Sequence, residues 1–316
     1  MNPEPVFVGF DIGGTNVRGV PLHADGSIGD TVKMARPEDP ENLVVTIAAL
    51  TGQLAEAVGA EVAAVGVGCA GIVDKAGVVR AWPNIPSLVQ FPLKDQLEAR
   101  LGLETLVEND ATTATWAEAR LGAARGFDDV AFVGLGTGIG TGFVLGGRLH
   151  RGAAGFAGES GHMTVMHDGL ACACGRRGCW ERYASGTAFG RLAREAAADG
   201  RADSLLELAG GSPDAVTSEH AATLIAVGDT QALAILSELG YWVAVGIANL
   251  VNVLDPAAVV IGGGLAEMGE PLLASIRAAY PKVMIDHELR DALAIVRSDF
   301  GGRSGAIGAA LLAQDL

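Results

Sequence analysis

Three of the four cysteines in this chain lie close together in the segment HMTVMHDGLACACGRRGCWE, which also holds two of the six histidines. The residues concerned are Cys172, Cys174, Cys179, His162 and His167. Three thiolates and one imidazole make a ligand set that structural zinc sites use to fill a tetrahedron. A disulfide framework would need cysteines in pairs, whereas the fourth cysteine is distant in the sequence. The segment therefore predicts a zinc site.

Two questions about this segment stay open on spacing alone. The thiols could instead form a free, partly buried cluster, and the basic Arg176 and Arg177 between them could indicate redox reactivity. Either His162 or His167 could be the fourth ligand, because both precede the cysteines. Metal analysis of the purified protein tests the zinc prediction.

Polar residues follow an apolar run in the segment LVENDATTATWAEARLG. Glu108, Asn109 and Asp110 stand where a predicted strand ends and an alanine-rich helix begins, which is a common place for catalytic groups in α/β proteins. A carboxylate at position 110 could accept the proton of a substrate hydroxyl that attacks a phosphoryl group. The alternative is that Asp110 only caps a helix beginning at Ala111.

A second group of polar residues flanks the cysteines. Glu159 and His162 are three residues apart in GFAGESGH, and Glu181 follows the last cysteine by two positions. If zinc clamps the loop, the three side chains are drawn together into a polar pocket suited to sugar hydroxyls. Taken singly, each acid could be an ordinary solvated surface charge.

Glycine-rich turns interrupt two apolar segments, VFVGFDIGGTNVRGVPL and VAFVGLGTGIGTGFVLGG. Each segment predicts a β-hairpin, and their likeness suggests two related halves. Successive backbone N–H groups in such turns can bind the phosphates of a nucleotide, and VVIGGGLA suggests a third turn facing a phosphate or an adenine. Neither hairpin has the pattern of a Walker loop or a Rossmann fingerprint. The alternative is an ordinary tight hairpin turn.

Helices and strands alternate around these motifs, which predicts an α/β fold. We expect helices at residues 40–58, 92–101, 188–199, 221–227, 230–254 and 304–312. We expect further strands at residues 62–68, 78–82, 104–107 and 292–296. Residues 203–218 contain Gly210, Gly211 and Pro213 and are expected to form a loop-rich surface segment.

Composition limits the function classes. A length of 316 residues suggests two domains, and a formal net charge of -15 argues against a nucleic-acid or anionic-membrane partner. The uncharged residues 130–147 are too rich in glycine for a membrane helix. We see no signal-peptide pattern, and few, clustered cysteines favour the cytoplasm.

On these motifs the chain resembles the ROK family of sugar kinases and repressors, and its bacterial glucokinases most closely. DIGGTN resembles the first phosphate motif of the family, GLGTGIGTG the second, and GESGH with CACGRRGCWERYASG the sugar and zinc signature. The resemblance runs from about Val6 to Leu312. It implies the actin-like, hexokinase-like ATPase fold, with an active-site cleft between two domains. The small α/β domain would comprise residues 1–111, completed by a C-terminal helix at 301–316, and the large α/β domain residues 112–300 with the zinc loop.

The resemblance also implies a reaction, which is the ATP-dependent phosphorylation of glucose at its 6-hydroxyl with Asp110 as general base. It implies sugar contacts by Asn84, Asn109, Asp110, Glu159, His162 and Glu181. It implies a structural zinc ion bound by His162, Cys172, Cys174 and Cys179. ATP with magnesium would lie along Asp11, Gly13, Gly14, Thr15, Thr137, Gly138, Gly263 and Gly264, with Asp11 near the magnesium ion. A homodimer or homotetramer is expected from the same resemblance.

Several alternatives remain at this point. Within kinases, the substrate could be mannose, fructose or an N-acetylhexosamine, and polyphosphate could be the phosphoryl donor. A sugar-sensing ROK regulator would carry a basic helix-turn-helix region ahead of the sugar domain, and only a few residues precede the first predicted strand. An ATPase of the actin or Hsp70 type would hydrolyse ATP without sugar.

Overall fold

The computed structural model of this chain describes residues 4–81 and 86–316. Within them the chain divides into two compact units. Unit 1 takes its described residues from Met1–Phe132, Gly142–Gly158 and Gly302–Leu316, and unit 2 comprises Val133–Thr141 and Glu159–Gly301. The small domain (residues 1–111 with 301–316) and the large domain (residues 112–300) expected from the sequence remain predictions.

Unit 1 is built on a five-stranded sheet of order β3-β2-β1-β4-β7. Its strands are β1 (Val6–Ile12), β2 (Asn16–His23), β3 (Val32–Ala35), β4 (Val62–Cys69) and β7 (Glu104–Asn109). β1 and β2 form the predicted antiparallel hairpin, whereas β1, β4 and β7 are parallel. The buried positions of these strands are mostly valine and other apolar residues, which suit a sheet covered on its faces. A two-stranded sheet, β5 (Ile72–Val73) and β6 (Val79–Ala81), follows β4.

The helices of unit 1 are α1 (Pro40–Val58), α2 (Leu93–Leu101), α3 (Asp110–Arg120) and α10 (Ser304–Gln314), with a short 3-10 turn at Pro86–Leu88. Local signals fix both ends of α1. The Asp39 side chain accepts a hydrogen bond from the Asn42 backbone N–H, and Pro40 occupies the first turn, where its missing N–H costs nothing. The helix ends at Gly59, whose φ of 65° is easily adopted only without a side chain.

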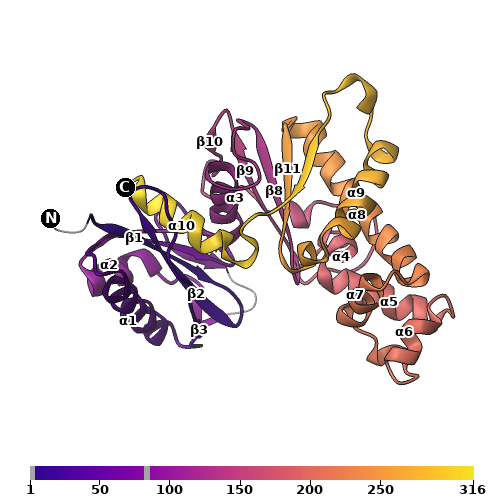
Figure 1. The fold of residues 1–316 in the computed structure, drawn as a ribbon, viewed down its shortest axis with the longest axis horizontal. Coiled ribbons are helices and arrows are strands. Elements are labelled where there is room, and N and C mark those ends of the chain that lie inside the picture. Colours follow the sequence, from indigo (N-terminus) through magenta and orange to yellow (C-terminus); the bar gives the residue numbers. More distant parts are fainter. Residues whose placement is uncertain (1–3, 82–85) are drawn as a thin grey trace. The chain divides into compact units, whose positions relative to one another are not determined.

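Helix α10 completes unit 1 from the other end of the chain and lies against β1 (Figure 1). Its residues from Ser304 to Ala313 are all buried. A Cβ atom added to Gly9 would lie 1.9 Å from the Ala306 carbonyl oxygen, and one added to Gly66 would lie 1.9 Å from that of Ala309. The helix therefore packs at backbone distance on β1 and β4, which only glycine permits at these two strand positions.

A second five-stranded sheet has the order β10-β9-β8-β11-β12. Its strands are β8 (Val130–Leu135), β9 (Ile139–Leu145), β10 (Arg148–Leu149), β11 (Ala258–Gly262) and β12 (Ala294–Arg297). The predicted hairpins thus occupy equivalent places in two sheets, each with a third strand beside the hairpin and two strands added from later in the chain. This is the arrangement that the repeated sequence pattern suggests.

The helices of unit 2 are α4 (Glu181–Ala184), α5 (Gly186–Ala198), α6 (Asp203–Leu208), α7 (Ser218–Ala226), α8 (Thr230–Leu254) and α9 (Glu270–Val283). Short 3-10 turns occur at Ser160–His162, Pro213–Ala215, Gly264–Met268, His287–Leu289 and Gly301–Arg303. By length and composition alone, α8 could cross a membrane. However, 61% of its most apolar window is buried inside the protein, as in the core helix of a globular domain.

The segment 203–218, predicted to be a loop-rich surface segment, is more helical than expected, although most of it is exposed or partly exposed. Helix α6 and the 3-10 turn Pro213–Ala215 occupy much of it, and Leu205 and Val216 are fully buried. Gly210 and Gly211, both with positive φ, separate these short helical pieces. The glycines and the proline therefore mark element ends rather than a long loop.

Candidate active site

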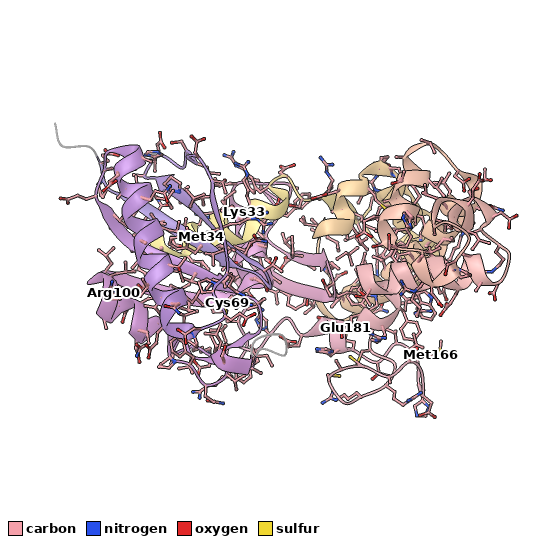
Figure 2. All side chains as sticks on the ribbon, turned by 90° about the horizontal axis from the view of Figure 1, so that it is seen from below. Lys33, Met34, Cys69, Arg100, Met166 and Glu181 are labelled. Carbon is pink, nitrogen blue, oxygen red and sulfur yellow. The ribbon has the colours of Figure 1, made fainter. Side chains whose placement is uncertain are left out.

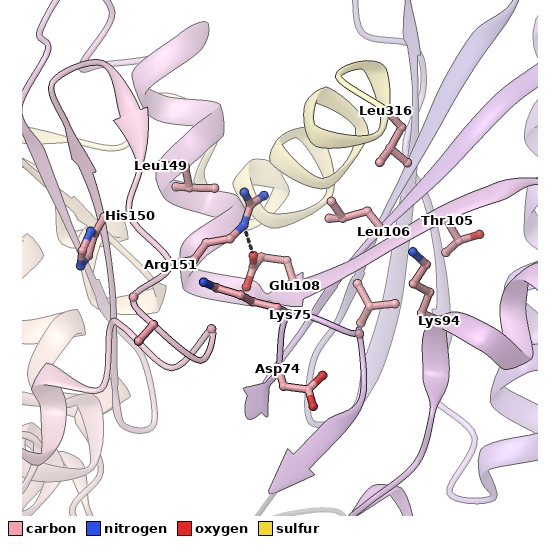
Figure 3. A pocket seen from close by; sticks show the side chains of 15 residues that line it. Asp74, Lys75, Lys94, Thr105, Leu106, Glu108, Leu149, His150, Arg151 and Leu316 are labelled. Atoms are coloured by element: carbon pink, nitrogen blue, oxygen red, sulfur yellow. Dashed lines mark hydrogen bonds and ion pairs between the residues drawn. The ribbon is translucent and has the colours of Figure 1, made fainter.

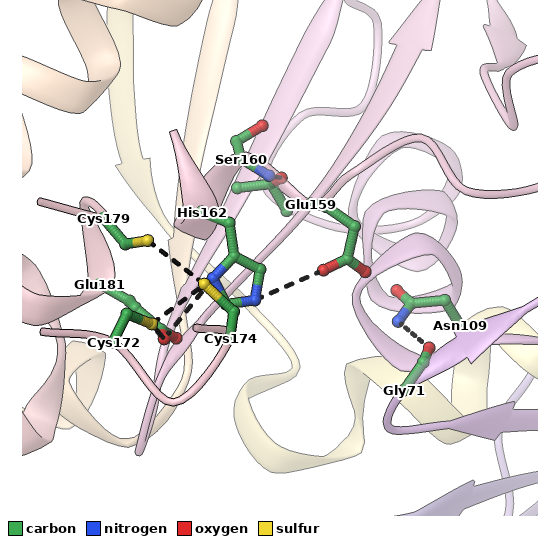
Figure 4. A network of polar contacts seen from close by, with 10 residues as sticks. Gly71, Asn109, Glu159, Ser160, His162, Cys172, Cys174, Cys179 and Glu181 are labelled. Carbon is green, nitrogen blue, oxygen red and sulfur yellow. Dashed lines mark hydrogen bonds and ion pairs between the residues drawn. The ribbon is translucent and has the colours of Figure 1, made fainter. Parts of the chain in front are cut away.

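The histidine and cysteine cluster forms a compact ligand set in unit 2 (Figure 4). The ligand atoms of His162, Cys172, Cys174 and Cys179 all lie within 4.8 Å of one another. The sulfur atoms of Cys174 and Cys179 are 3.6 Å apart, and the Nδ1 atom of His162 is 3.9 Å from the sulfur of Cys172. A tetrahedral zinc ion with bonds of about 2.3 Å to sulfur holds neighbouring sulfurs about 3.8 Å apart. The set therefore fits a zinc-sized metal ion.

The structure groups His162, not His167, with the cysteines. The His167 side chain is 93% exposed and pairs with Asp168 at 3.2 Å. Cys69 is fully buried in β4 of unit 1 (Figure 2) and takes no part in the cluster. Burial, followed by the nearby Glu181 carboxylate, raises the pKa of Cys172 to about 12. A cation at the centre would favour the thiolate forms instead.

Backbone hydrogen bonds close the loop that carries these ligands. The Trp180 N–H donates to the Met163 carbonyl at 2.8 Å, which brings the segment after His162 beside that of Cys179. Gly178 has a φ of 75°, and a Cβ atom there would lie 1.8 Å from the Met166 carbonyl oxygen. The turn therefore requires glycine.

Trp180 anchors the loop to helix α8, a role that the sequence analysis missed. Its side chain is fully buried, and its indole N–H donates to the Trp242 carbonyl at 2.8 Å. Gly246 leaves room for the indole ring, because a Cβ atom there would lie 1.9 Å from it. The signals were a tryptophan directly after a predicted ligand and glycines within a long apolar helix.

The predicted sugar contacts Glu159 and Glu181 both lie next to His162. An Oε2 atom of Glu159 is 3.9 Å from Nε2 of His162, and Oε1 of Glu181 is 3.7 Å from Nδ1. The Cys172 thiol also donates to Glu181 at 3.0 Å. The imidazole thus faces the cysteines with one nitrogen and Glu159 with the other. This arrangement leaves Nε2 available to a substrate when Nδ1 is a ligand.

In unit 1, Asp110 lies at the first position of α3, directly after β7. The prediction that it could cap a helix beginning at Ala111 is wrong, because the cap is Asn109. Asn109 has extended dihedral angles, its Oδ1 accepts from the Thr112 N–H at 3.0 Å, and its Nδ2 donates to the Gly71 carbonyl at 3.0 Å. The Asp110 carboxylate accepts from the Ala111 N–H at 2.8 Å.

The charge of Asp110 affects the pKa of the Asp11 carboxyl group. Strand register aligns Asp11 with Gly68 and aligns Asn109 with Cys69, so both acids stand at the carboxyl ends of parallel strands. Burial, and then the charge of Asp110, raises the pKa of Asp11 to about 7, although Arg18 at 3.5 Å opposes the shift. Burial also raises the pKa of Asp110. Two such carboxylates suit proton acceptance and cation binding.

The first glycine turn, between β1 and β2, is open on its outer side. The Gly13 N–H donates to the Asn16 carbonyl at 2.9 Å, and the Arg36 side chain donates to the Gly14 carbonyl at 3.1 Å. No atom of the described residues lies within 4 Å of a Cβ atom built on Gly14. Gly13, Gly14 and Thr15 therefore present a surface that a phosphate could approach.

The second glycine turn forms one wall of a cavity of about 820 Å³ in unit 2. The remaining walls come from the start of α5, from α7 and from the segment after β11. Its lining residues are Leu135, Gly136, Thr137, Gly186, Thr187, Phe189, Ser218, Glu219, Ala222, Ile225, Ala226, Gly264, Leu265, Glu267, Met268 and Pro271. A helix N-terminus beside a glycine turn suits phosphates, and apolar side chains suit a base, so the cavity could hold a mononucleotide.

Close contacts hold this second turn in place. The Gly186 N–H donates to the Gly136 carbonyl at 2.7 Å, and the Thr187 hydroxyl donates to the Thr137 carbonyl at 2.8 Å. Gly263, with a φ of 78°, passes so near Leu135 that a Cβ atom would lie 2.6 Å from its backbone. The sequence analysis missed Thr187, although Ser185 before it is a recognisable helix-capping residue.

The predicted site residues therefore fall into two sets, each described within its own unit. Unit 1 holds Asp11, Gly13, Gly14, Thr15, Asn109 and Asp110, and unit 2 holds Thr137, Gly138, Glu159, His162, Cys172, Cys174, Cys179, Glu181, Gly263 and Gly264. Asn84 lies outside the described residues.

Comparisons with known proteins agree over almost the whole chain. The model of the ROK family matches residues 7–316. The glucokinase of Streptomyces coelicolor is 39% identical over 312 residues, which cover 98% of this chain and 97% of that protein.

Two solved structures extend the comparison. The crystal structure of a ROK family glucokinase from Streptomyces griseus in complex with glucose and AMPPNP has 41% identity and a TM-score of 0.87, covering 98% of this chain and 100% of that chain. The ROK hexokinase of Thermus thermophilus has 32% identity and a TM-score of 0.82, covering 98% of each chain. The actin-like, hexokinase-like α/β fold predicted from the motifs is confirmed, and the chain belongs to the ROK family.

Proposed function

We propose that this chain is an ATP-dependent glucokinase, which transfers the γ-phosphoryl group of ATP to the 6-hydroxyl of glucose. The observation that carries the proposal is its likeness, over nearly its full length, to a glucokinase crystallised with glucose and AMPPNP. A cavity of nucleotide size and a polar cluster suited to hydroxyls support it from this chain's own residues.

Asp110 is the proposed general base. A carboxylate offers about four lone-pair sites, so Asp110 keeps acceptor capacity for the 6-hydroxyl proton beside its bond from the Ala111 N–H. As that proton moves to Asp110, the hydroxyl oxygen bonds to the γ-phosphorus, and the bond to the β–γ bridging oxygen breaks to release ADP. The raised pKa of Asp110 makes it a better proton acceptor than an ordinary aspartate, provided that it is ionised when the sugar binds.

Hexose recognition is proposed for Asn84, Asn109, Glu159, His162 and Glu181. Glu159 can accept from sugar hydroxyls, and His162 can present Nε2 to the sugar while Nδ1 faces the cysteines. Amide and carboxylate side chains together can satisfy both the donor and acceptor capacity of each hydroxyl.

The nucleotide is proposed to occupy the cavity of unit 2, with its phosphates toward Thr137, Gly138 and the start of α5. Asp11 is proposed to hold Mg²⁺, because a carboxylate oxygen is a ligand that this cation prefers. When bound, Mg²⁺ neutralises phosphate charge. The glycine turns then orient the phosphates through backbone N–H groups without adding side-chain charge.

A structural Zn²⁺ ion is proposed for His162, Cys172, Cys174 and Cys179. Its contribution is to hold the loop so that His162 and Glu181 keep fixed positions beside Glu159. A homo-oligomer remains a prediction from the family resemblance, and a cytoplasmic location remains a prediction from the cysteine pattern.

The test is MgATP-dependent ADP release with glucose, mannose, fructose, N-acetylglucosamine and N-acetylmannosamine, with a no-sugar control and identification of the product. We expect selective turnover with glucose that gives glucose 6-phosphate. Faster turnover with another sugar, or with polyphosphate in place of ATP, would change the substrate assignment. Equal ADP release without sugar would favour an ATPase acting on other partners.

A further inference from the structure

A partly buried ion pair lies at the end of β7, beside a cavity of about 570 Å³ within unit 1 (Figure 3). The Arg151 Nε donates to Oε2 of Glu108 at 2.5 Å. The Glu108 side chain is only 7% exposed, and that of Arg151 is 34% exposed. A short, charge-assisted bond to a carboxylate with so little solvent is stronger than an exposed ion pair.

The other oxygen of the same carboxylate holds the strand end. Oε1 of Glu108 accepts from the Asn109 N–H at 3.0 Å. Asn109 in turn caps α3 and holds the Gly71 carbonyl through its side chain. Glu108 thus holds the peptide between residues 108 and 109, one residue before Asp110.

Arg151 belongs to the part of unit 1 from which the chain passes into unit 2. A second contact anchors this segment at Gly155, whose φ is 97°. A Cβ atom on Gly155 would lie 3.0 Å from the Val73 carbonyl oxygen and 3.0 Å from the Lys75 nitrogen. The segment ends at Gly158, and the next residue is Glu159, a proposed sugar contact.

We propose that the Glu108–Arg151 ion pair is a positioning device for hexose phosphorylation. It ties the strand end before the proposed base to the segment before a proposed sugar contact, through one carboxylate. The inference rests on the proposed function, since it gives Asp110 and Glu159 their roles. Neither Glu108 nor Arg151 is assigned a contact with substrate, so both act through their neighbours.

The expected result of Arg151→Ala is a loss of kcat of about tenfold to a hundredfold, because small displacements of catalytic groups cost this much. The KM for glucose should rise, whereas the KM for MgATP should stay within about twofold, because the nucleotide cavity is formed by unit 2 residues. Arg151→Lys should lose less, since the ammonium keeps the charge but not the direction of the Nε–H bond. Glu108→Gln should resemble Arg151→Ala in kcat.

A second variant that already lacks the proposed base distinguishes a loss of positioning from a loss of folded protein. In the Asp110→Asn variant, adding Arg151→Ala should reduce the residual turnover by no more than about twofold. The reason is that a residue that only positions Asp110 cannot lower the rate much further once the carboxylate is gone. The control is Arg201→Ala, which removes an exposed ion pair with Asp199 and should leave kcat unchanged. Thermal midpoints of every variant show whether a loss of activity follows a loss of folded protein.

Three outcomes overturn the inference. The first is that kcat and the KM for glucose stay within about twofold of the unaltered chain in both Arg151→Ala and Glu108→Gln. The second is that Arg151→Ala causes the same fold loss with and without Asp110. The third is that the KM for MgATP rises as much as the KM for glucose. If Arg151→Ala does not fold, Arg151→Lys and Glu108→Gln carry the same test. If the unaltered chain phosphorylates no sugar, the proposed function fails first and this role falls with it, whereas active enzyme with indifferent variants rejects the positioning role alone.

Discussion

The two glycine turns occupy equivalent places in two sheets of the same strand order, but their surroundings differ. The first turn is flanked by charged side chains: Asp11 precedes it, Arg18 pairs with Asp11, and Arg36 holds Gly14. The second turn has no charged residue of its own between Val130 and Gly147. Its hydrogen bonds run to Gly186 and Thr187 at the start of α5.

This difference indicates that the two turns offer different chemical groups to a ligand. The sheet with the charged turn also carries Asp110 at a strand end, so its half of the chain has the groups that can take a proton and hold a cation. The uncharged turn relies on backbone dipoles and a helix N-terminus, which bind phosphates without a charged side chain. A duplicated hairpin can thus keep its topology while what packs around its turn changes its chemistry.

The largest expected effect is that of removing the proposed base. Asp110→Asn should lower kcat by about 10²-fold to 10⁴-fold, because a positioned base contributes about this much. Glucose binding, measured by calorimetry, should change little. Full retained turnover would remove Asp110 from the mechanism and with it the chemical role of the first sheet.

The same variant has a predicted effect on stability. Burial raises the pKa of Asp110 above its ordinary value of 3.8, so ionising it costs the folded state free energy at neutral pH. Asp110→Asn should therefore raise the thermal midpoint at pH 8, and the gain should shrink as the pH falls and disappear well below 3.8, where the carboxyl is neutral in both states. A lower midpoint at pH 8 would contradict this assignment.

The next largest effect should come from the metal cluster. Cys174→Ser should remove bound zinc, lower the thermal midpoint and raise the KM for glucose at least about tenfold, since His162 and Glu181 lose their fixed positions. Zinc content by mass spectrometry and glucose kinetics measure this. Cys69→Ala is the matched control, because Cys69 is buried outside the cluster. This variant should keep the zinc content of the unaltered chain. Normal glucose kinetics in zinc-free protein would separate the metal from sugar binding.

A pH series tests the charged turn. Since the pKa of Asp11 is raised to about 7, the carboxylate is protonated below that pH and binds Mg²⁺ poorly. The Mg²⁺ concentration for half-maximal rate should rise by about tenfold per pH unit below 7 and level off above it. In Asp11→Asn the slope should vanish, and an unchanged slope would assign it to another group.

The smallest effects compare the two turns directly. A Cβ atom on Gly138 would lie 2.6 Å from Oε2 of Glu181, whereas one on Gly14 would have no atom of the described residues within 4 Å. Gly138→Ala should therefore lower the thermal midpoint and raise the KM for ATP a few-fold, at a cost of about 1 kcal/mol. Gly14→Ala should leave the midpoint unchanged and affect only ATP kinetics. A stability loss in Gly14→Ala, or none in Gly138→Ala, would contradict the contrast.

Much of the fold was predictable because its signals are local. The bounds of α1 and α8 agree with the predicted residues 40–58 and 230–254, since each helix has a capping aspartate next to its first turn. Both hairpins followed from apolar runs around glycine turns. The three cysteine ligands followed because a short loop brings them together without the rest of the chain.

The rest depended on contacts between residues distant in the sequence. Spacing could not choose between His162 and His167, because the choice is made by the pairing of Met163 with Trp180 and by the anchoring of Trp180 on α8. The cap at Asn109 depends on how far β7 pairs with β4. The partner of Glu108 is 43 residues away.

The sequence by itself thus determined most of the element types and bounds, the three clustered thiols and the family. These properties are set by backbone dihedral preferences, caps and hydrophobic periodicity over a few residues. Only the tertiary structure decided which histidine joins the cysteines, which residue caps α3, and that Arg151 meets Glu108. Those outcomes depend on which buried surfaces and polar groups meet when distant segments pack, and no local pattern encodes that.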